Sequence, residues 1–178
     1  MRVLTLALCL IASRAAAQQP VPVSSVPESA RAESVPAPVQ PPAPPPPSPE
    51  QLRYLDGLKT AGRGVAQLKD GVNRVANSGR DTIKLKLAGR RLGGLCGTAR
   101  VFMTSGRGRM PLNAYSDSTQ LRARRLAIQI DTLVRVAGRC EASAARQPDS
   151  TAAGVLFALR AYEAVLRDFR AAIGLPNR

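Results

Sequence analysis

Histidine and tryptophan are both absent from the 178 residues, and aromatic residues make up only 3% of them. Without histidine there is no Ser-His-Asp or Cys-His catalytic site, no imidazole-ligated metal and no ordinary haem site. Acidic residues are scarce and scattered, so no carboxylate pair suited to acid-base catalysis stands out, and no glycine-rich phosphate-binding motif occurs. The sequence therefore predicts a protein that is not an enzyme and that needs no cofactor or metal.

The scarcity of aromatic residues also bears on the fold. A hydrophobic core has to be built from Leu, Val, Ile and Ala, which is typical of closely packed helices rather than of a β-sandwich. Apolar or small residues recur at alternating spacings of four and three, which places them on one face of a helix. Four segments show this pattern: residues 54–75, 85–102, 123–144 and 155–173. We expect an all-α fold, an antiparallel four-helix bundle with one long loop at residues 104–117.

Local signals set the expected ends of these helices. Ser48 and Gln51 have the spacing of a capping box with proline between them, and Ser116 or Asp117 can cap the third helix. The Gln-Pro-Asp stretch at 147–149 separates the third helix from the fourth, which should stop at Gly174. The second segment is less certain in form, because residues 83–87 alternate like a strand and Gly93-Gly94 could break a helix. We expect a helix there, because no partner strand is evident.

The segment 1–17 reads as a secretory signal peptide. Arg2 is followed by an apolar run over residues 3–12, and Ala15 and Ala17 occupy the small-residue positions before a cut at Gln18. The run is shorter than the roughly 20 residues that a membrane span needs. An uncleaved anchor is the alternative. Lipidation at Cys9 is disfavoured, because Leu8 precedes it where a small residue is usual. We therefore expect an exported protein, in the periplasm of the bacterial envelope or outside the cell.

Proline dominates the next segment, residues 18–50, which holds 12 of the 15 prolines. Proline fixes φ and removes a hydrogen-bond donor, so we expect a polyproline-II-like, partly disordered tether ahead of the folded domain at residues 51–178. The alternative is a docking site for a proline-binding module. No second apolar run is long enough to span a membrane, and we expect the mature protein to have no transmembrane segment.

Two cysteines stay in the chain once the signal is removed. Cys96 and Cys140 both fall within apolar stripes, and in an exported protein such a pair predicts one disulfide; two buried free thiols are the alternative. In a simple hairpin Cys96 would face residue 125, about 15 residues before Cys140. To bring the two cysteines together, either the long loop runs back along the bundle or the second helix breaks at its glycines. Gly89, Gly93 and Gly97 recur every four residues and would let another backbone approach closely near Cys96.

Positive charge is the most prominent feature of the folded part. The whole chain has 26 Lys and Arg against 12 Asp and Glu, a formal charge of +14, and between residues 80 and 125 the numbers are 11 and 2. Arginine forks suit phosphate and carboxylate groups. The candidate anion-binding residues are Arg107, Arg109, Arg122, Arg124 and Arg125. The alternative is a solvated basic surface without a ligand. Arg, Ala, Gly and Pro are abundant together, and GC-rich codon usage favours this composition without any role in binding.

These observations predict a binding or structural role at the envelope, with an anionic polymer, a lipid headgroup or an acidic protein as partner. The sequence argues against a nucleic-acid partner, because only Phe102 and Tyr115 fall inside the basic stretch and aromatic stacking residues do not interleave it. The second hypothesis is a carrier of a small apolar ligand or cofactor, with a cavity between helices lined by Leu126, Ile130, Leu159 and Phe102. Asp131, beside an apolar stripe, is expected to pair with an arginine.

Overall fold

A computed structural model describes residues 46–176; the expected signal peptide and most of the expected tether lie outside them. In this part of the chain 82% of the residues are helical and there is no strand. The four helices are α1 (Pro49–Ala76), α2 (Thr82–Gly108), α3 (Asp117–Ser143) and α4 (Pro148–Ala172). The predicted all-α fold with four packed helices is confirmed.

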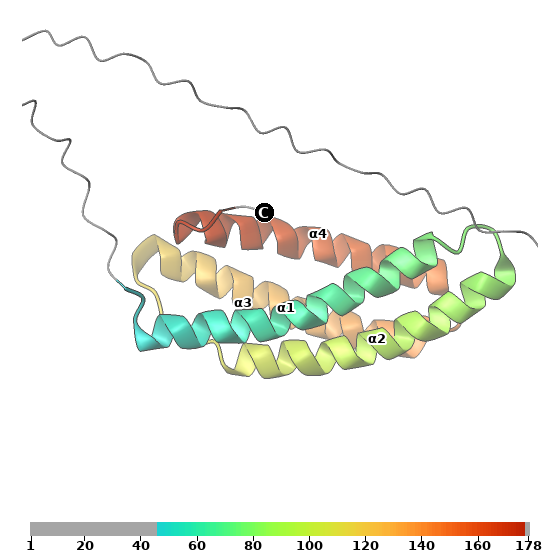
Figure 1. Ribbon diagram of the computed structural model, residues 1–178, viewed down its shortest axis with the longest axis horizontal. Helices are drawn as coiled ribbons and strands as arrows, with labels where there is room; N and C mark the ends of the chain where they lie inside the picture. The colour runs from blue at the N-terminus through green and yellow to red at the C-terminus, as the bar shows by residue number, and fades with distance from the viewer. Residues whose placement is uncertain (1–45, 177–178) are drawn as a thin grey trace, which may run out of the picture. The chain divides into compact units, whose positions relative to one another are not determined.

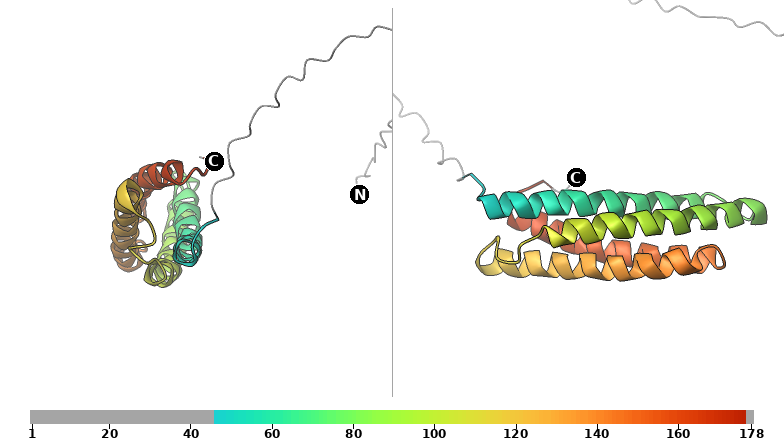
Figure 2. Two further views of the ribbon diagram at one scale, coloured as in Figure 1. Left: turned by 90° about the vertical axis from the view of Figure 1, so that its left-hand side faces the viewer. Right: turned by 90° about the horizontal axis from the view of Figure 1, so that it is seen from below.

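The helices run alternately up and down the bundle (Figure 1). Each helix packs along the next one in the chain, and α4 returns to lie beside α1, which closes the ring seen end-on in Figure 2. Helices α1 and α2 have the most extensive contact, whereas the contact between α1 and α4 is the slightest of the four. Helices α2 and α4 therefore lie diagonally across the bundle.

The helix ends follow the local signals. Ser48 accepts a hydrogen bond from the Gln51 backbone and the Gln51 side chain accepts one from the Ser48 backbone, so the predicted capping box is formed. Because α1 begins at Pro49, the folded part takes in the end of the expected tether. Asp81 caps α2 by accepting from the backbone of the next turn, which favours helix over strand for the alternating segment that follows.

Helix α2 is longer than the sequence suggested. It continues past the glycine pair at 93–94 without a break and ends at Gly108, so the connection to α3 covers residues 109–116. The expectation of a loop at 104–117 is wrong in extent. The small residues near this end of α2 are helical because Gly106 packs against the α1 backbone, where a β-carbon would lie 2.5 Å from backbone atoms. Packing of this kind outweighs the low helix propensity of glycine.

The connection between α2 and α3 runs onward along the bundle instead of back. It starts with Met110 beside Gly57 of α1 and then brings Tyr115 against Tyr54, whose ring centroid lies 5.4 Å away. Tyr54 is closer than Gly57 to the start of α1, and α1 runs antiparallel to α2. The connection therefore continues past the end of α2 in the direction in which α2 runs. Both sequence alternatives, a loop that runs back and a helix broken at its glycines, are therefore wrong.

This path brings the two cysteines level with each other. Cys96 lies in the second half of α2, which ends at Gly108, whereas Cys140 lies in the last turn of α3, which begins at Asp117. At about 1.5 Å per helical residue, these positions put the start of α3 about 16 Å beyond the end of α2. The α-carbons of Cys96 and Cys140 are 6.0 Å apart and their sulfur atoms are bonded, which confirms the predicted pair.

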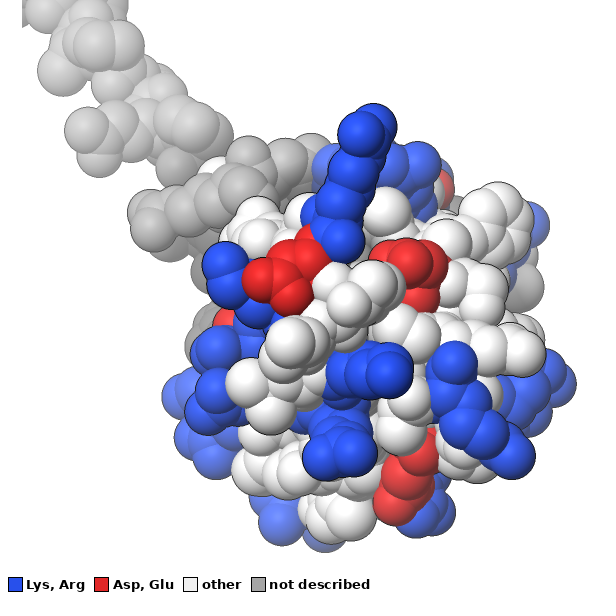
Figure 3. Space-filling model, turned by 90° about the vertical axis from the view of Figure 1, so that its right-hand side faces the viewer, with Lys and Arg blue, Asp and Glu red and all other residues white. Residues whose placement is uncertain are grey.

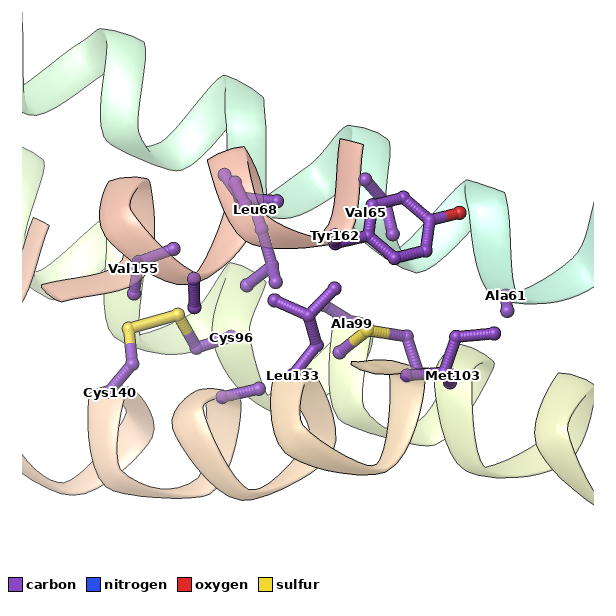
Figure 4. Packing of buried hydrophobic residues seen from close by; sticks show 14 of the residues in the cluster. Ala61, Val65, Leu68, Cys96, Ala99, Met103, Leu133, Cys140, Val155 and Tyr162 are labelled. Atoms are coloured by element: carbon purple, nitrogen blue, oxygen red, sulfur yellow. A yellow bond between two sulfur atoms is a disulfide. The ribbon is translucent and has the colours of Figure 1, made fainter. Parts of the chain in front are cut away.

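The predicted apolar stripes form one continuous core (Figure 4). Its largest fully buried side chains are Tyr54, Phe169, Leu68, Leu92, Met103, Leu126, Ile130, Leu133 and Val155, together with the two bonded cysteines. At the end where α1 begins, Tyr54, Tyr115 and Phe169 form an aromatic cluster with ring centroids 5.4 Å apart in each pair. Half of the six Phe and Tyr residues of the chain thus close one end of the core.

The glycine groove predicted on α2 faces the end of α3. A β-carbon on Gly89 would lie 2.5 Å from the carbonyl oxygen of Ala144, and one on Gly97 would lie 2.8 Å from a carboxylate oxygen of Glu141. Gly93, between them, has room for ordinary contact with the same turn of α3. The absence of side chains here lets α3 approach α2 closely beside the disulfide.

Candidate binding surfaces

The arginines at the end of α2 are engaged in ion pairs. Arg107 lies 3.2 Å from the carboxylate of Asp131 on α3, which confirms that Asp131 pairs with an arginine. Arg109 lies 3.3 Å from the carboxylate of Asp56 on α1. Two of the five candidate anion-binding residues therefore join helices of the bundle. Such exposed pairs contribute little stability each, but the carboxylates reduce the net charge that these arginines offer to a ligand.

The other three candidates are exposed at the start of α3 but point in different directions. Arg124 lies two turns before Asp131 and shares its face, which is the face toward α2. The Ser143 hydroxyl contacts Thr151 of α4 at 3.1 Å, so this side of α3 is turned toward α4. Arg125 lies about five helical turns before Ser143 and therefore shares that side. Arg122 lies one turn before Arg125 on that same side. The structure therefore does not gather the five candidate arginines into one patch.

The basic stretch at residues 80–125 is also divided along the bundle. Helix α2 has 27 residues and is about 40 Å long. Its first three turns lie at the end that holds the α1–α2 turn, whereas Arg107, Arg109 and the start of α3 lie at the opposite end. In between, Arg100 is paired with Glu141 at 3.1 Å. The two ends of the bundle have to be considered as separate surfaces.

The end that holds the α1–α2 turn carries five exposed basic residues within twelve positions. We call this group the basic end; its members are Arg80, Lys84, Lys86, Arg90 and Arg91. Asp81 is the one acidic residue among these positions; it caps α2 and lies 3.6 Å from the ammonium group of Lys84. Among residues 46–176, no carboxylate forms an ion pair with any of the other four. Figure 3 looks onto this end, where blue side chains cover more of the surface than red ones.

Two large apolar side chains stand out from the basic end. Ile83 is 80% exposed and Leu87 is 63% exposed. They lie one turn apart on α2, and Arg90 continues the same line, so this face points away from the core. Residues 83–87 alternate between apolar and basic, and the core uses only Leu85 of the three apolar ones. In the sequence this alternation raised only the question of strand or helix, and the exposed apolar pair was not predicted.

Three of the four residues expected to line a carrier cavity lie in the core. Leu126, Ile130 and Leu159 are buried in the continuous core, and Phe102 is half-buried. Three open grooves at the surface, of about 460, 380 and 360 Å³, are lined by other residues. Leu126, Ile130 and Leu159 therefore pack the core, and none of the four side chains lines these three grooves.

The three tyrosines serve the core. The Tyr54 hydroxyl donates a 2.7 Å hydrogen bond to the carbonyl oxygen of Ala123, which ties α1 to α3. Burial raises the pKa of Tyr54 well above its ordinary value, and burial raises the pKa of Tyr162 to about 12.

Within residues 46–176, no three His, Cys, Asp or Glu side chains come together as a metal site. In that same range, none of the helices combines the length and apolar character of a membrane span.

No family model, curated protein or solved structure matches this chain.

Proposed function

We propose that the protein is an exported, non-enzymatic module that binds the anionic surface of a membrane through the basic end of α2. The observation that carries the proposal is the combination on one outward face: Ile83 and Leu87 are exposed, and the cations Lys86, Arg90 and Arg91, which pair with no carboxylate of residues 46–176, surround them. Phosphate groups of lipids suit the cations, and the acyl region below them suits the two apolar side chains. The expected leader at residues 1–17 supports a partner in the bacterial envelope.

The expected binding energy has two sources. A Lys or Arg near an anionic bilayer contributes about 1 kcal/mol, and this part weakens as salt screens the charges. Burying an exposed Ile or Leu side chain contributes about 1.5–3 kcal/mol, and salt affects this part little. Together they are enough for reversible peripheral attachment, and they require neither a spanning helix nor an enzyme site.

An acidic protein or a soluble envelope polymer is the competing partner class. Either would be attracted by the same cations, but neither gives Ile83 and Leu87 an apolar medium to enter. Helix α1 begins at the end of the bundle opposite the basic end. The tether expected at residues 18–50 would therefore join the module at the far end from the basic end, which suits binding of the basic end to a second surface.

Sedimentation with lipid vesicles tests the proposal. The full chain should sediment with vesicles of phosphatidylcholine and phosphatidylglycerol and stay in solution with phosphatidylcholine alone. The triple variant Lys86→Gln, Arg90→Gln, Arg91→Gln should bind the anionic vesicles roughly a hundredfold more weakly, because three cations are lost.

The matched control removes the same charge from the other end, as Arg122→Gln, Arg124→Gln, Arg125→Gln. It should bind the anionic vesicles as the unmodified chain does. Equal loss in both triple variants would show that net charge alone drives binding and would refute the proposal. Polyglutamate binding as strong as vesicle binding, with Ile83→Ser and Leu87→Ser without effect, would instead assign a soluble anionic partner.

A further inference from the structure

An open groove separates α1 from α4 near the end of the bundle where α1 begins. Its volume is about 380 Å³, within the range of roughly 300–1,000 Å³ that small-molecule sites occupy. The lining is mostly apolar: Leu55, Leu58, Gly62, Tyr162, Leu166, Phe169, Ile173 and Leu175. The groove exists because α1 and α4 make the slightest contact of any neighbouring helices in the bundle.

The charged side chains in the lining of this groove are both cations. Lys59 is exposed at its edge, and Arg170 lines it from α4; no carboxylate of residues 46–176 is part of the lining. The Nε atom of Arg170 is buried and has no hydrogen-bond partner among residues 46–176, although a buried donor of this kind is usually satisfied. An anionic group at this position would supply the missing acceptor.

Two further features suit a ligand. Tyr162 is almost fully buried and lines the groove, and because burial raises its pKa to about 12 the hydroxyl is protonated at neutral pH and can donate a hydrogen bond. Gly62 lines the groove from α1, and a β-carbon there would have nothing within 4 Å. The groove therefore has free space opposite a buried tyrosine and an unpartnered arginine.

We propose that this groove binds a fatty acid, with the acyl chain along the leucines of α1 and α4 and the carboxylate at Arg170 and Lys59. The charge of the lining selects an anion, and its apolar surface selects a hydrocarbon chain. The site uses α1 and α4, whereas the membrane surface proposed above uses the first turns of α2. The two proposals can therefore fail independently.

Two other occupants would use the apolar lining without needing its cations. A second copy of this chain could cover the groove with an apolar face, and the proline-rich segment before residue 46 could fold over it. Neither accounts for the two cations of the lining. The segment 18–45 is nearly neutral, with one Arg and two Glu, and a second copy of this chain carries the same formal charge of +14. A fatty acid satisfies both the lining and the charge.

Titration calorimetry of the full chain with laurate tests the site. Laurate should bind at one site per chain, and dodecanol, which has the chain but no charge, should bind at least tenfold more weakly. Arg170→Gln should weaken laurate binding roughly tenfold to a hundredfold, the range for loss of one hydrogen bond to a charged group.

Gly62→Leu blocks the groove without crowding the core, because its position is open, and it should abolish laurate binding. Gly154→Leu is the matched control: Gly154 is also a helical glycine with nothing within 4 Å of a β-carbon, and it lies in the groove between α3 and α4. Gly154→Leu should leave laurate binding unchanged, and thermal unfolding should show that both variants are folded.

Several results would overturn the proposal. The proposal is wrong if laurate and dodecanol bind with equal affinity. It is also wrong if Gly62→Leu or Arg170→Gln leaves the affinity for laurate unchanged. A concentration-dependent dimer that Gly62→Leu dissociates, without laurate binding, would assign the groove to a second copy. Laurate binding that appears only when residues 1–45 are deleted would assign the groove to that segment. The vesicle result for the basic end is independent of every one of these outcomes.

Discussion

Gly64 of α1 lies directly against Ala99 of α2, so close that a β-carbon on Gly64 would be 2.6 Å from the Ala99 carbonyl oxygen. Gly57 and Gly71 lie seven residues to either side of Gly64, and a β-carbon on either of them would also lie 2.6 Å from an atom of α2. Glycines that reduce the propensity of α1 thus allow it to pack closely on α2. This explains why a helix with four glycines is stable within the bundle.

Two glycines of α1 provide a matched pair of substitutions. Gly64→Ala should lower the free energy of unfolding by about 1–3 kcal/mol, because the new methyl group meets rigid backbone. Gly62→Ala should raise it by up to about 1 kcal/mol, because the position is open and alanine favours helix. Urea unfolding measures both. A stabilising effect at Gly64 would contradict the close packing of α1 and α2.

The disulfide should contribute a large part of the stability. Cys96 and Cys140 close a separation of 44 residues, which corresponds to roughly 4 kcal/mol in the chain-entropy description. The double variant Cys96→Ala, Cys140→Ala should therefore unfold at much lower urea concentration. As a control, a reducing agent should destabilise the unmodified chain to a similar degree and leave the double variant unaffected. No effect of the reducing agent on the unmodified chain would show that the thiols are free.

Much of the fold could be predicted from the sequence, because it follows from local rules. The four stripes and the Ser48 capping box depend only on periodicity and on neighbours within one turn. The extent of α2 and the path of residues 109–116 depend on contacts between helices, such as Gly106 against α1. A glycine that serves close packing and a glycine that ends a helix look the same in one sequence. That is why the loop was predicted too long.

Alkaline pH should destabilise the protein. The pKa values of Tyr54, Tyr115 and Tyr162 are all raised by burial, to about 12 for Tyr162, whereas an unfolded chain has tyrosine pKa values of about 10. Between these values the folded state holds more protons than the unfolded state, so stability is fully present below about pH 10 and falls as pH rises further. Tyr54 and Tyr162 each contribute up to about 1.4 kcal/mol per pH unit, and the more exposed Tyr115 contributes less.

Ultraviolet absorbance of tyrosinate measures this effect directly, because the chain has no tryptophan. In the folded protein Tyr54 and Tyr162 should not ionise near pH 10, and their ionisation should coincide with loss of helical circular dichroism at higher pH. Tyr54→Phe is the informative variant. It removes the hydrogen bond to Ala123 and should lower the free energy of unfolding at neutral pH by about 1–2 kcal/mol. Ionisation of all three tyrosines near pH 10 with the helices intact would contradict their burial.

The ion pair of Arg107 and Asp131 should have a small structural effect and no effect on vesicle binding. Asp131 is half exposed, so Asp131→Asn should lower the free energy of unfolding by less than about 1 kcal/mol. Arg107→Gln should have a similar effect, and the double variant should cost less than the two single effects combined. Vesicle sedimentation provides the second readout. Loss of binding in Arg107→Gln would return this arginine to the binding surface.

The candidate site was only partly predictable. The excess of arginine over residues 80–125 is visible in the sequence, but its division between two ends follows from the length of α2. The pairing of Arg107 and Arg109 with carboxylates on other helices depends on tertiary packing. The exposure of Ile83 and Leu87 could have been read from the sequence, because both fall outside the stripe that begins at Leu85. The alternation of these apolar residues with lysine is also typical of a strand, and it was interpreted only in that sense.

Entry of the basic end of α2 into an anionic membrane surface can be measured directly, because the chain has no tryptophan of its own. A single tryptophan at Ile83 (Ile83→Trp) reports the polarity around that position, and Phe157→Trp, on the diagonally opposite helix α4, is the control because Phe157 is 78% exposed. Vesicles containing phosphatidylglycerol should shift the Ile83→Trp emission to the blue and leave Phe157→Trp unchanged, and phosphatidylcholine vesicles should shift neither. An unshifted Ile83→Trp emission, or an equal shift in both variants, would contradict entry of the basic end into the membrane surface.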